Sequence, residues 1–129
     1  MVGENAEAVR LLADALRRGD ADMLAARTHP EAEAETLRSA VQGTFHGPEG
    51  AREFVRDNQE SFEIFEPRYD EVEEMPDGRV IAIGRLHIRG RGSGAETEVP
   101  IAAVVEFRDG LMYRYRDYGD ADAARAAVG

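Results

Sequence analysis

The sequence predicts a single α+β domain in which helices come first and a largely antiparallel sheet follows. The first half of the 129-residue chain carries apolar residues at helical spacing, and the second half carries alternating or continuous apolar runs that are typical of strands. Helices and strands that are segregated in this way usually form two layers, with the helices over one face of the sheet. The length suits one core, so residues 1–129 are expected to form one domain.

The first predicted helix covers residues 5–18. Its apolar residues follow the i, i+3, i+4, i+7 spacing of one helical face, and they are Val9, Leu12, Ala13 and Leu16. Asn5 is the expected cap at its start, and Gly19 is the expected residue at its end. Asp20 then begins a short second helix, which must stop before Pro30 because proline disfavours helical geometry in the residue that precedes it.

A third helix is predicted to begin at residues 47–49, where glycine, proline and glutamate occur in the order typical of a helix start. Its expected buried face consists of Ala51, Phe54, Val55, Asn58, Phe62 and Phe65. Residues 31–36 alternate between acidic and small residues, which leaves either a short edge strand or a loop.

Four strands are predicted in the second half, over residues 69–75, 79–89, 96–108 and 111–118. Asp109 and Gly110 form the two-residue signal that favours a tight hairpin, so the last two strands are expected to be antiparallel neighbours. A short final helix is predicted from Asp120. Residues 101–105 are all apolar, which predicts burial of both faces of this strand. A second subunit often covers the outer face of such a sheet, so we expect a homodimer.

Composition excludes several classes of function. The chain has no cysteine, which excludes disulfides, thiolate nucleophiles and cysteine-type zinc sites. Its three histidines are scattered and its net charge is −10, so we expect no metal, no other cofactor and no nucleic-acid partner. No apolar run approaches the roughly 18 residues that cross a bilayer, and the start of the chain lacks a secretory signal. A cytoplasmic protein without membrane contact is expected.

Short motifs occur in an order that resembles the SnoaL-like branch of the nuclear-transport-factor-2-like superfamily. They lie at residues 18–20, 29–31, 47–50, 91–94, 108–110 and 116–120, and they read RGD, HPE, GPEG, RGSG, RDG and RDYGD. The resemblance implies a cone formed by the helices and a strongly curved sheet, which encloses a mostly apolar pocket for a small apolar molecule. Relatives include ketosteroid isomerases, polyketide cyclases, limonene-epoxide hydrolases and proteins without catalysis, so the activity must be argued from the site.

Asp117 is the leading candidate for a catalytic residue. Strand alternation places Tyr113, Tyr115 and Asp117 on one face, which we expect to line the pocket. The motif around Asp117 is similar to the end of limonene-epoxide hydrolases, and this resemblance implies that Asp117 is a general base. An alternative is that Asp117 forms only a structural ion pair with Arg116 or Arg85.

Arg85 and His87 are the other two candidate catalytic residues. They share a strand face with Ile81 and Ile83, and the triplet at residues 85–87 is similar to an Arg-x-Asp triplet of the same hydrolases. If this face lines the pocket, Arg85, His87 and Asp117 converge there, with His87 as a proton partner and Arg85 as an orienting cation. Histidine replaces the second acid of those hydrolases, so their activity does not carry over. His87 is alternatively an ordinary strand residue.

The remaining expected pocket-lining residues are Ile83, Ile101, Phe54 and Phe62. Two functions follow from these candidates. The first is a general acid/base enzyme, of the isomerase, cyclase or epoxide-hydrolase kind, that acts on a small apolar substrate. The alternative is a non-catalytic domain that binds a hydrophobic ligand or only dimerises. A protein-interaction module ranks behind both, because no large exposed apolar segment is evident.

Overall fold

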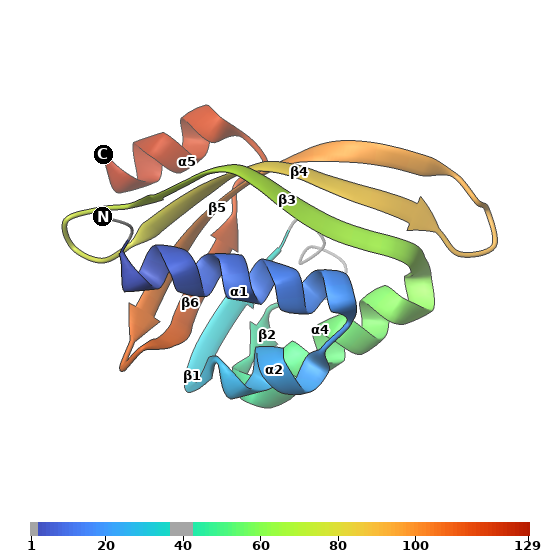
Figure 1. Ribbon diagram of the computed structural model, residues 1–129, viewed down its shortest axis with the longest axis horizontal. Helices are drawn as coiled ribbons and strands as arrows, with labels where there is room; N and C mark the ends of the chain where they lie inside the picture. The colour runs from blue at the N-terminus through green and yellow to red at the C-terminus, as the bar shows by residue number, and fades with distance from the viewer. Residues whose placement is uncertain (1–2, 37–42) are drawn as a thin grey trace.

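The computed structural model describes residues 3–36 and 43–129 and shows an α+β domain built on one curved, open sheet (Figure 1). The strand order in the sheet is β2-β1-β6-β5-β4-β3. The helices are α1 (Glu4–Arg18), α2 (Ala21–Ala26), α4 (Gly47–Ser61) and α5 (Ala121–Val128). The strands are β1 (Thr28–Glu35), β2 (Phe45–His46), β3 (Phe62–Glu74), β4 (Val80–Gly90), β5 (Glu96–Arg108) and β6 (Leu111–Asp117).

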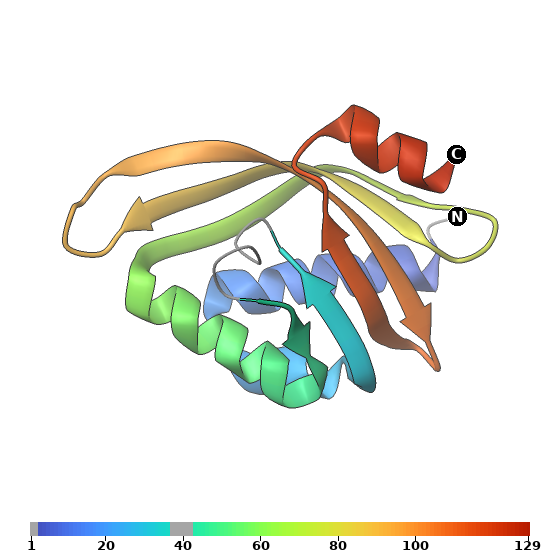
Figure 2. The same cartoon turned by 180° about the vertical axis from the view of Figure 1, so that it is seen from behind.

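Helices α1, α2 and α4 lie on the concave side of the sheet (Figures 1 and 2). The apolar face predicted for α1 is confirmed, since Val9, Leu12 and Ala13 are buried. Gly19 ends the helix with a positive φ of 66°, as predicted, and the Asp20 carboxylate caps α2 by accepting a hydrogen bond from the Met23 N–H at 3.0 Å. The prediction that Asn5 caps α1 is wrong, because Gly3 occupies that position.

The sheet is antiparallel except at one junction, where β1 runs parallel to β6. The predicted hairpin between β5 and β6 is confirmed, and both turn residues have positive φ, 55° at Asp109 and 78° at Gly110. Residues 31–36, left open as a strand or a loop, fall mainly in β1. This strand lies inside the sheet between β2 and β6 and is not an edge.

The third helix ends earlier than predicted. Helix α4 stops at Ser61, so Phe62 and Phe65 belong to the start of β3 and not to a helical face. Strand β3 extends through Pro67, which the sequence placed before the first strand. Because β3 is the last strand of the sheet, one of its sides has no neighbouring strand, and a proline there costs no ladder hydrogen bond.

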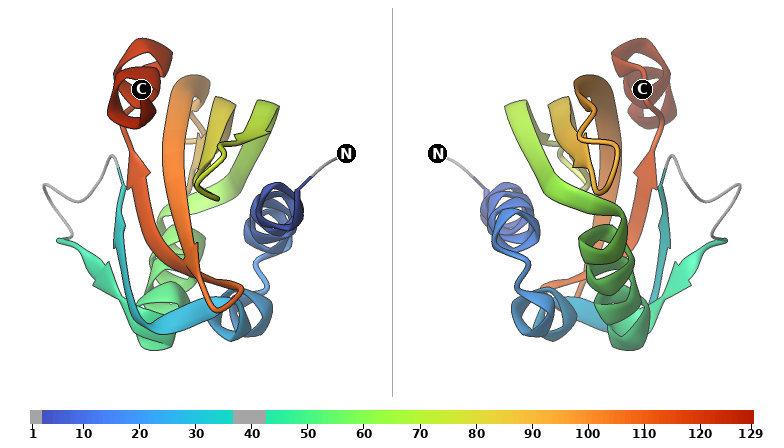
Figure 3. Two further views of the ribbon diagram at one scale, coloured as in Figure 1. Left: turned by 90° about the vertical axis from the view of Figure 1, so that its left-hand side faces the viewer. Right: turned by 90° about the vertical axis from the view of Figure 1, so that its right-hand side faces the viewer.

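Strand β5 is buried on both faces over residues 101–105, as predicted, and a different partner covers each face. On the concave side, Ala103 and Val105 join a core with α1 and α4. On the convex side, Ala102 and Val104 join a second core with Ala124 of α5. Figure 3 shows α5 and α1 on opposite sides of the sheet. The protein's own C-terminal helix thus supplies the cover that the sequence argument assigned to a second subunit.

No helix within residues 3–36 and 43–129 has both the length and the apolar character needed to cross a bilayer.

Candidate active site

A cavity of about 120 Å³ lies between the concave face of the sheet and helices α1, α2 and α4. Most of its lining is aliphatic or aromatic, as in sites for small apolar molecules. The apolar lining includes Val9, Leu12, Leu16, Phe45, Phe54, Phe65, Pro67, Leu86, Ile101, Val105 and Met112.

Three polar side chains meet on one wall of this cavity: Asp117, Tyr115 and Tyr69. Asp117 and Tyr115 come from β6, where alternation places them on the same face. Tyr69 comes from β3, which is separated from β6 by the two strands β5 and β4. Thr28 and Thr36 also line the cavity. The Thr28 hydroxyl donates a hydrogen bond to the Leu24 carbonyl at 2.7 Å.

The Asp117 carboxylate is held by the main chain. Its Oδ1 accepts one hydrogen bond from the Gly119 N–H at 2.8 Å and another from the Ala102 N–H at 3.2 Å. Both bonds go to the same oxygen, and Oδ2 receives none from the described residues. The carboxylate therefore keeps a fixed orientation and a second oxygen with no hydrogen-bond partner in the described chain.

Burial raises the pKa of Asp117 above its ordinary value, and the two N–H donors oppose this shift only in part. In the described part of the chain, no basic side chain forms an ion pair with Asp117. Arg116, the neighbour proposed as its partner, instead lies 3.5 Å from Glu35 of β1. The ion pair of Asp117 with Arg116 or Arg85, which was the alternative, is therefore absent from the described residues. A carboxylate with a raised pKa and no counter-ion is a stronger base than a free carboxylate.

The Tyr69 and Tyr115 hydroxyls are 3.2 Å apart and share a hydrogen bond. The pKa of Tyr69 is raised to about 12, mainly by burial; the Tyr115 hydrogen bond lowers this pKa and the negative charge of Asp117 raises it. Burial, together with Tyr69 and Asp117, keeps the pKa of Tyr115 well above its ordinary value. Both tyrosines are thus neutral at physiological pH, and one hydroxyl of the pair can donate to an acceptor in the cavity.

Comparison with known proteins identifies the fold. The SnoaL-like domain model matches residues 9–115, which is most of the chain. The chain belongs to the SnoaL-like family. No functionally curated protein matches it.

Solved structures agree with this assignment to the SnoaL-like family. An NTF2-like protein of unknown function from Burkholderia pseudomallei is 21% identical, covers 95% of each chain and has a TM-score of 0.80. TerC, co-crystallised with polyporic acid, is 22% identical, with coverage of 96% and 97% and a TM-score of 0.78. Bal32a, from a soil-derived mobile gene cassette, is 29% identical, with coverage of 89% and 88% and a TM-score of 0.78.

Four of the residues predicted for the site line the cavity of this SnoaL-like domain. They are Asp117, Tyr115, Ile101 and Phe54. The first three lie on the concave faces of β5 and β6, and Phe54 reaches the cavity from α4. The position of these residues agrees with the sequence prediction, while their chemical roles stay predictions.

The predicted convergence of Arg85, His87 and Asp117 is wrong. On β4 the residue that faces the cavity is Leu86, so Arg85 and His87 lie on the convex face. His87 points toward β5 there, with Nε2 2.7 Å from the Glu96 Oε1, and Arg85 is exposed. Neither can exchange a proton with a ligand beside Asp117. The matching triplet of limonene-epoxide hydrolases therefore has no counterpart inside this cavity.

Three predicted lining residues also lie outside the cavity, each for a separate reason. Ile83 is on the convex face of β4 and packs against the core beneath α5. Phe62 lines a neighbouring groove at the end of α4. Tyr113 is displaced by a β-bulge in β6, where β5 residues 106 and 107 pair with residues 114 and 112. The extra residue turns Tyr113 outward, where its ring contacts His29 and Arg108.

Tyr69 is the polar lining residue that sequence reasoning missed. It alternates with Phe65 and Pro67, and all three line the cavity. This spacing was visible in the sequence, but the predicted helix extended to Phe65 and hid the strand. Across the β3–β4 pair, Tyr69 faces Gly84, whose missing side chain leaves space for the close approach of β3.

A metal centre finds no support in the described residues, because no three histidine or acidic side chains gather there in an arrangement that could hold an ion. The groups available to a bound molecule are instead one carboxylate and two phenolic hydroxyls in apolar surroundings. This set suits proton transfer and stabilisation of a developing oxyanion.

Proposed function

We propose that this chain binds a small, largely apolar molecule in the cavity and moves a proton on it through Asp117. The observation that supports this most strongly is the Asp117 carboxylate itself: a group with a raised pKa, fixed by two main-chain donors and without a counter-ion in the described chain. Burying a charged carboxylate without a counter-ion costs free energy, and residues held at such a cost are common at functional sites.

The proposed step is proton transfer next to a carbonyl group. Oδ2 of Asp117 takes a proton from the carbon beside the carbonyl, and the electron pair of that C–H bond moves to the carbonyl oxygen to give an enolate. One hydroxyl of the Tyr69–Tyr115 pair donates a hydrogen bond to this oxygen as its negative charge develops. The protonated Asp117 then returns the proton to carbon, at the same or another position, and the carboxylate is restored.

A single acid/base residue is sufficient for this chemistry, since one carboxylate both removes and returns the proton. Epoxide hydrolysis, in contrast, needs an acid to protonate the epoxide oxygen in addition to a base that activates water. The proposed class is therefore isomerase-like or cyclase-like. The neighbour TerC, co-crystallised with polyporic acid, is consistent with small organic ligands for this fold, although its low identity supports the fold alone.

Hydrogen exchange of an apolar ketone tests the proposal without knowledge of the natural substrate. We expect the wild-type chain to accelerate exchange of the α-hydrogens of 2-tetralone in D₂O, measured by NMR. Asp117→Asn keeps the size of the side chain and its Oδ1 acceptor, and we expect it to lose on the order of 10²–10⁴-fold of the acceleration. Tyr115→Phe is expected to lose less, since Tyr69 can still donate.

The matched control is Arg85→Gln, which removes a charge on the opposite face of the sheet and should exchange 2-tetralone at the wild-type rate. Retention of full acceleration by Asp117→Asn would contradict the role of this residue. If 2-tetralone binds in the cavity and no variant, wild type included, exceeds the buffer rate, the chain is a non-catalytic ligand-binding domain.

A further inference from the structure

A second, polar groove of about 230 Å³ adjoins the cavity. It lies where the last turns of α1 and α4 meet the start of β3 and the turn between β4 and β5. Leu16 and Phe65 line both spaces, so these two side chains form the boundary between them. The other residues that line the groove are Arg17, Arg18, Gly19, Val55, Asn58, Gln59, Phe62, Glu63 and Arg91.

Positive charge dominates the lining of this groove. Three arginines line it and only one carboxylate, that of Glu63, which is itself 3.9 Å from Arg89. The chain as a whole carries a net charge of −10. Among the described lining residues arginine nonetheless outnumbers carboxylate, and a guanidinium without a carboxylate partner attracts an anion.

Arg91 is the best-placed of the three. Its Nε donates to the Gln59 carbonyl at 3.0 Å and its Nη2 to the Phe62 carbonyl at 3.2 Å, so the end of α4 holds the guanidinium in place. Arg91 forms no ion pair with a carboxylate of the described residues, and its Nη1 has no hydrogen bond to them. One edge of a fixed guanidinium is thus available to an incoming acceptor.

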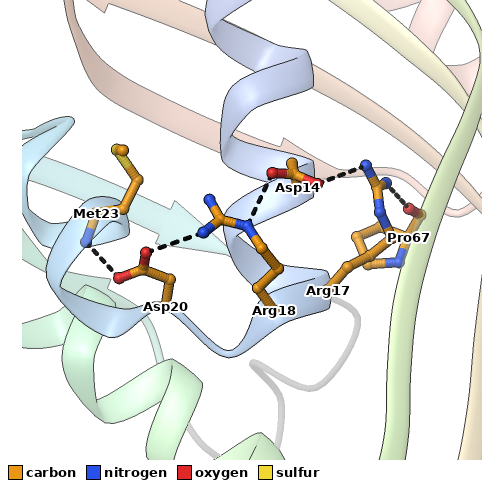
Figure 4. Close-up of polar contacts among 6 residues, drawn as sticks. All are labelled: Asp14, Arg17, Arg18, Asp20, Met23 and Pro67. Carbon is orange, nitrogen blue, oxygen red and sulfur yellow. Dashed lines mark hydrogen bonds and ion pairs between the residues drawn. The ribbon is translucent and has the colours of Figure 1, made fainter.

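Arg17 and Arg18 also line the groove, and Figure 4 shows their polar contacts with Asp14, Asp20 and Pro67. Arg17 donates to the Pro67 carbonyl at 2.8 Å, and both arginines share the Asp14 carboxylate, at 3.4 and 2.9 Å. Arg18 also lies 3.3 Å from Asp20. The ion pairs with Asp14 and Asp20 are exposed, so they stabilise the arginines weakly and can be exchanged for a ligand at little cost.

Capping of a helix end explains the contacts of Arg91, which donates to the Gln59 and Phe62 carbonyls at the end of α4, but not the arrangement as a whole. Lysine or arginine in the last turn of a helix is favourable on its own. It does not require arginines from two separate segments, α1 and the turn between β4 and β5, to line one open space beside an apolar cavity. That arrangement is what an elongated ligand with an apolar body and a charged end would need.

We propose that the groove binds an oxyanion at the end of the same ligand whose apolar body occupies the cavity. The ligand class is therefore an amphipathic acid, such as an apolar carbonyl compound with a terminal carboxylate or phosphate. Arginine pairs with both groups through two parallel hydrogen bonds. This inference rests on the proposed function, which places the ligand in the cavity. It adds that the far end of this ligand carries a negatively charged group.

Titration calorimetry with matched straight-chain probes tests this proposal. Octanoate, octyl phosphate and 1-octanol share an apolar chain and differ in the terminal group. We expect one or both anions to bind the wild-type chain roughly tenfold or more tightly than the alcohol, the gain typical of a hydrogen bond to a charged group. The net charge of −10 acts against this preference, so general electrostatics cannot produce it. The anion that binds more tightly identifies the charged end group that the groove prefers.

Arg91→Gln is expected to remove most of the preference for the anion while leaving the affinity for 1-octanol unchanged. Arg85→Gln changes the net charge equally on the opposite face and should keep the preference. Because Arg91 also holds the end of α4, Arg17→Gln provides a second variant, and it should reduce the preference in the same direction. Thermal melts of each variant check that it is folded.

The outcomes separate the two proposals. If 1-octanol binds and competes with 2-tetralone but neither anion is favoured, the cavity proposal stands and the groove proposal is wrong. An anion preference that survives both Arg91→Gln and Arg17→Gln also overturns it. If none of the octyl probes binds, the groove proposal is wrong, and exchange of 2-tetralone decides separately whether the cavity proposal stands.

Discussion

The two faces of the central strands β4 and β5 have nearly the same apolar composition, but one face is fully packed and the other borders a cavity. On the convex face, Ile81, Ala102 and Val104 are sealed beneath α5. On the concave face, Ala82, Ala103 and Val105 border helices that leave an open cavity beside them. Apolar pattern alone therefore does not distinguish a face that is filled from a face that encloses a site.

The polar side chains distinguish the concave face, which borders the cavity, from the packed convex face. Asp117 and the two tyrosines lie on the concave face, within apolar walls. On the convex face, His87 contacts Glu96 outside the α5 core. A single uncompensated carboxylate in an apolar space is thus a better indicator of the site than a larger number of charges.

Gly84 gives the largest expected effect on stability. A Cβ at this position would lie 1.9 Å from the Arg68 carbonyl oxygen, which belongs to the backbone and cannot move aside cheaply. Gly84→Ala should lower the free energy of unfolding by at least about 3 kcal/mol, measured by urea denaturation. Arg85→Ala, one residue further on the exposed face, should change it by about 0.5 kcal/mol or less. Equal effects would contradict the register of β3 and β4.

Ile81 tests whether α5 really seals the convex face. Its side chain is 1% exposed and packs in the core with Ala124. Ile81→Ala should cost about 2–3 kcal/mol of unfolding free energy, in the lower part of the range for buried aliphatic truncations, since the short helix can settle inward. The same truncation made in a chain that lacks residues 121–128 should cost clearly less. An unchanged cost would show that another surface covers this face.

Asp117→Asn should change the pH dependence of stability. The pKa of Asp117 is raised in the folded chain by burial, so its protonated form stabilises the fold at low pH and this contribution is lost as pH rises through the folded pKa. The melting temperature of Asp117→Asn relative to wild type should therefore increase from below pH 3.8, the ordinary pKa, toward neutral pH.

Asp77 provides the control with the opposite sign. The Arg79 N–H bond, with help from the Arg79 side chain, lowers the pKa of Asp77. The melting temperature of Asp77→Asn relative to wild type should thus decrease as pH rises over the same range. Circular-dichroism melts across a pH series measure both differences, and a flat profile for Asp117→Asn would contradict the burial of its charge.

The smallest effect is expected from the ion pairs between β1 and β6. Arg114 lies 3.6 Å from Glu33 and Arg116 lies 3.5 Å from Glu35, and all four side chains are at least 41% exposed. Arg114→Gln and Arg116→Gln should each change the free energy of unfolding by about 0.5 kcal/mol or less, by urea denaturation. A cost several times larger would mean that this surface is covered in solution.

Local signals predicted most of the fold correctly. The apolar stripe of α1, the positive φ at Gly19 and the turn at Asp109 depend on neighbouring residues, so the sequence is sufficient to find them. The boundary between α4 and β3 was missed because the aromatic residues at 62 and 65 continue the helical spacing of the residues before them. Their pairing with the distant strand β4 decides the outcome.

The site was predictable only where alternation ran without interruption. It does so from Tyr115 to Asp117, and both were placed correctly. It fails at Tyr113, where a bulge adds a residue, and such a bulge depends on pairing with β5. On β4 both faces are apolar near Ile81, so hydrophobicity gave no basis for choosing the face that lines the cavity. The resemblance of residues 85–87 to limonene-epoxide hydrolases then led to the face of Arg85 and His87, which is the convex one.

The anchoring of Asp117 has a consequence for how such a domain can evolve. Its Oδ1 is held by main-chain N–H groups at residues 102 and 119, which every amino acid except proline provides. Substitutions in the cavity wall can therefore change which molecule fits without displacing the carboxylate. Under the proposed function, an acid whose position does not depend on neighbouring side chains makes this scaffold tolerant of new substrates, and it offers protein engineers a fixed base around which the walls can be redesigned.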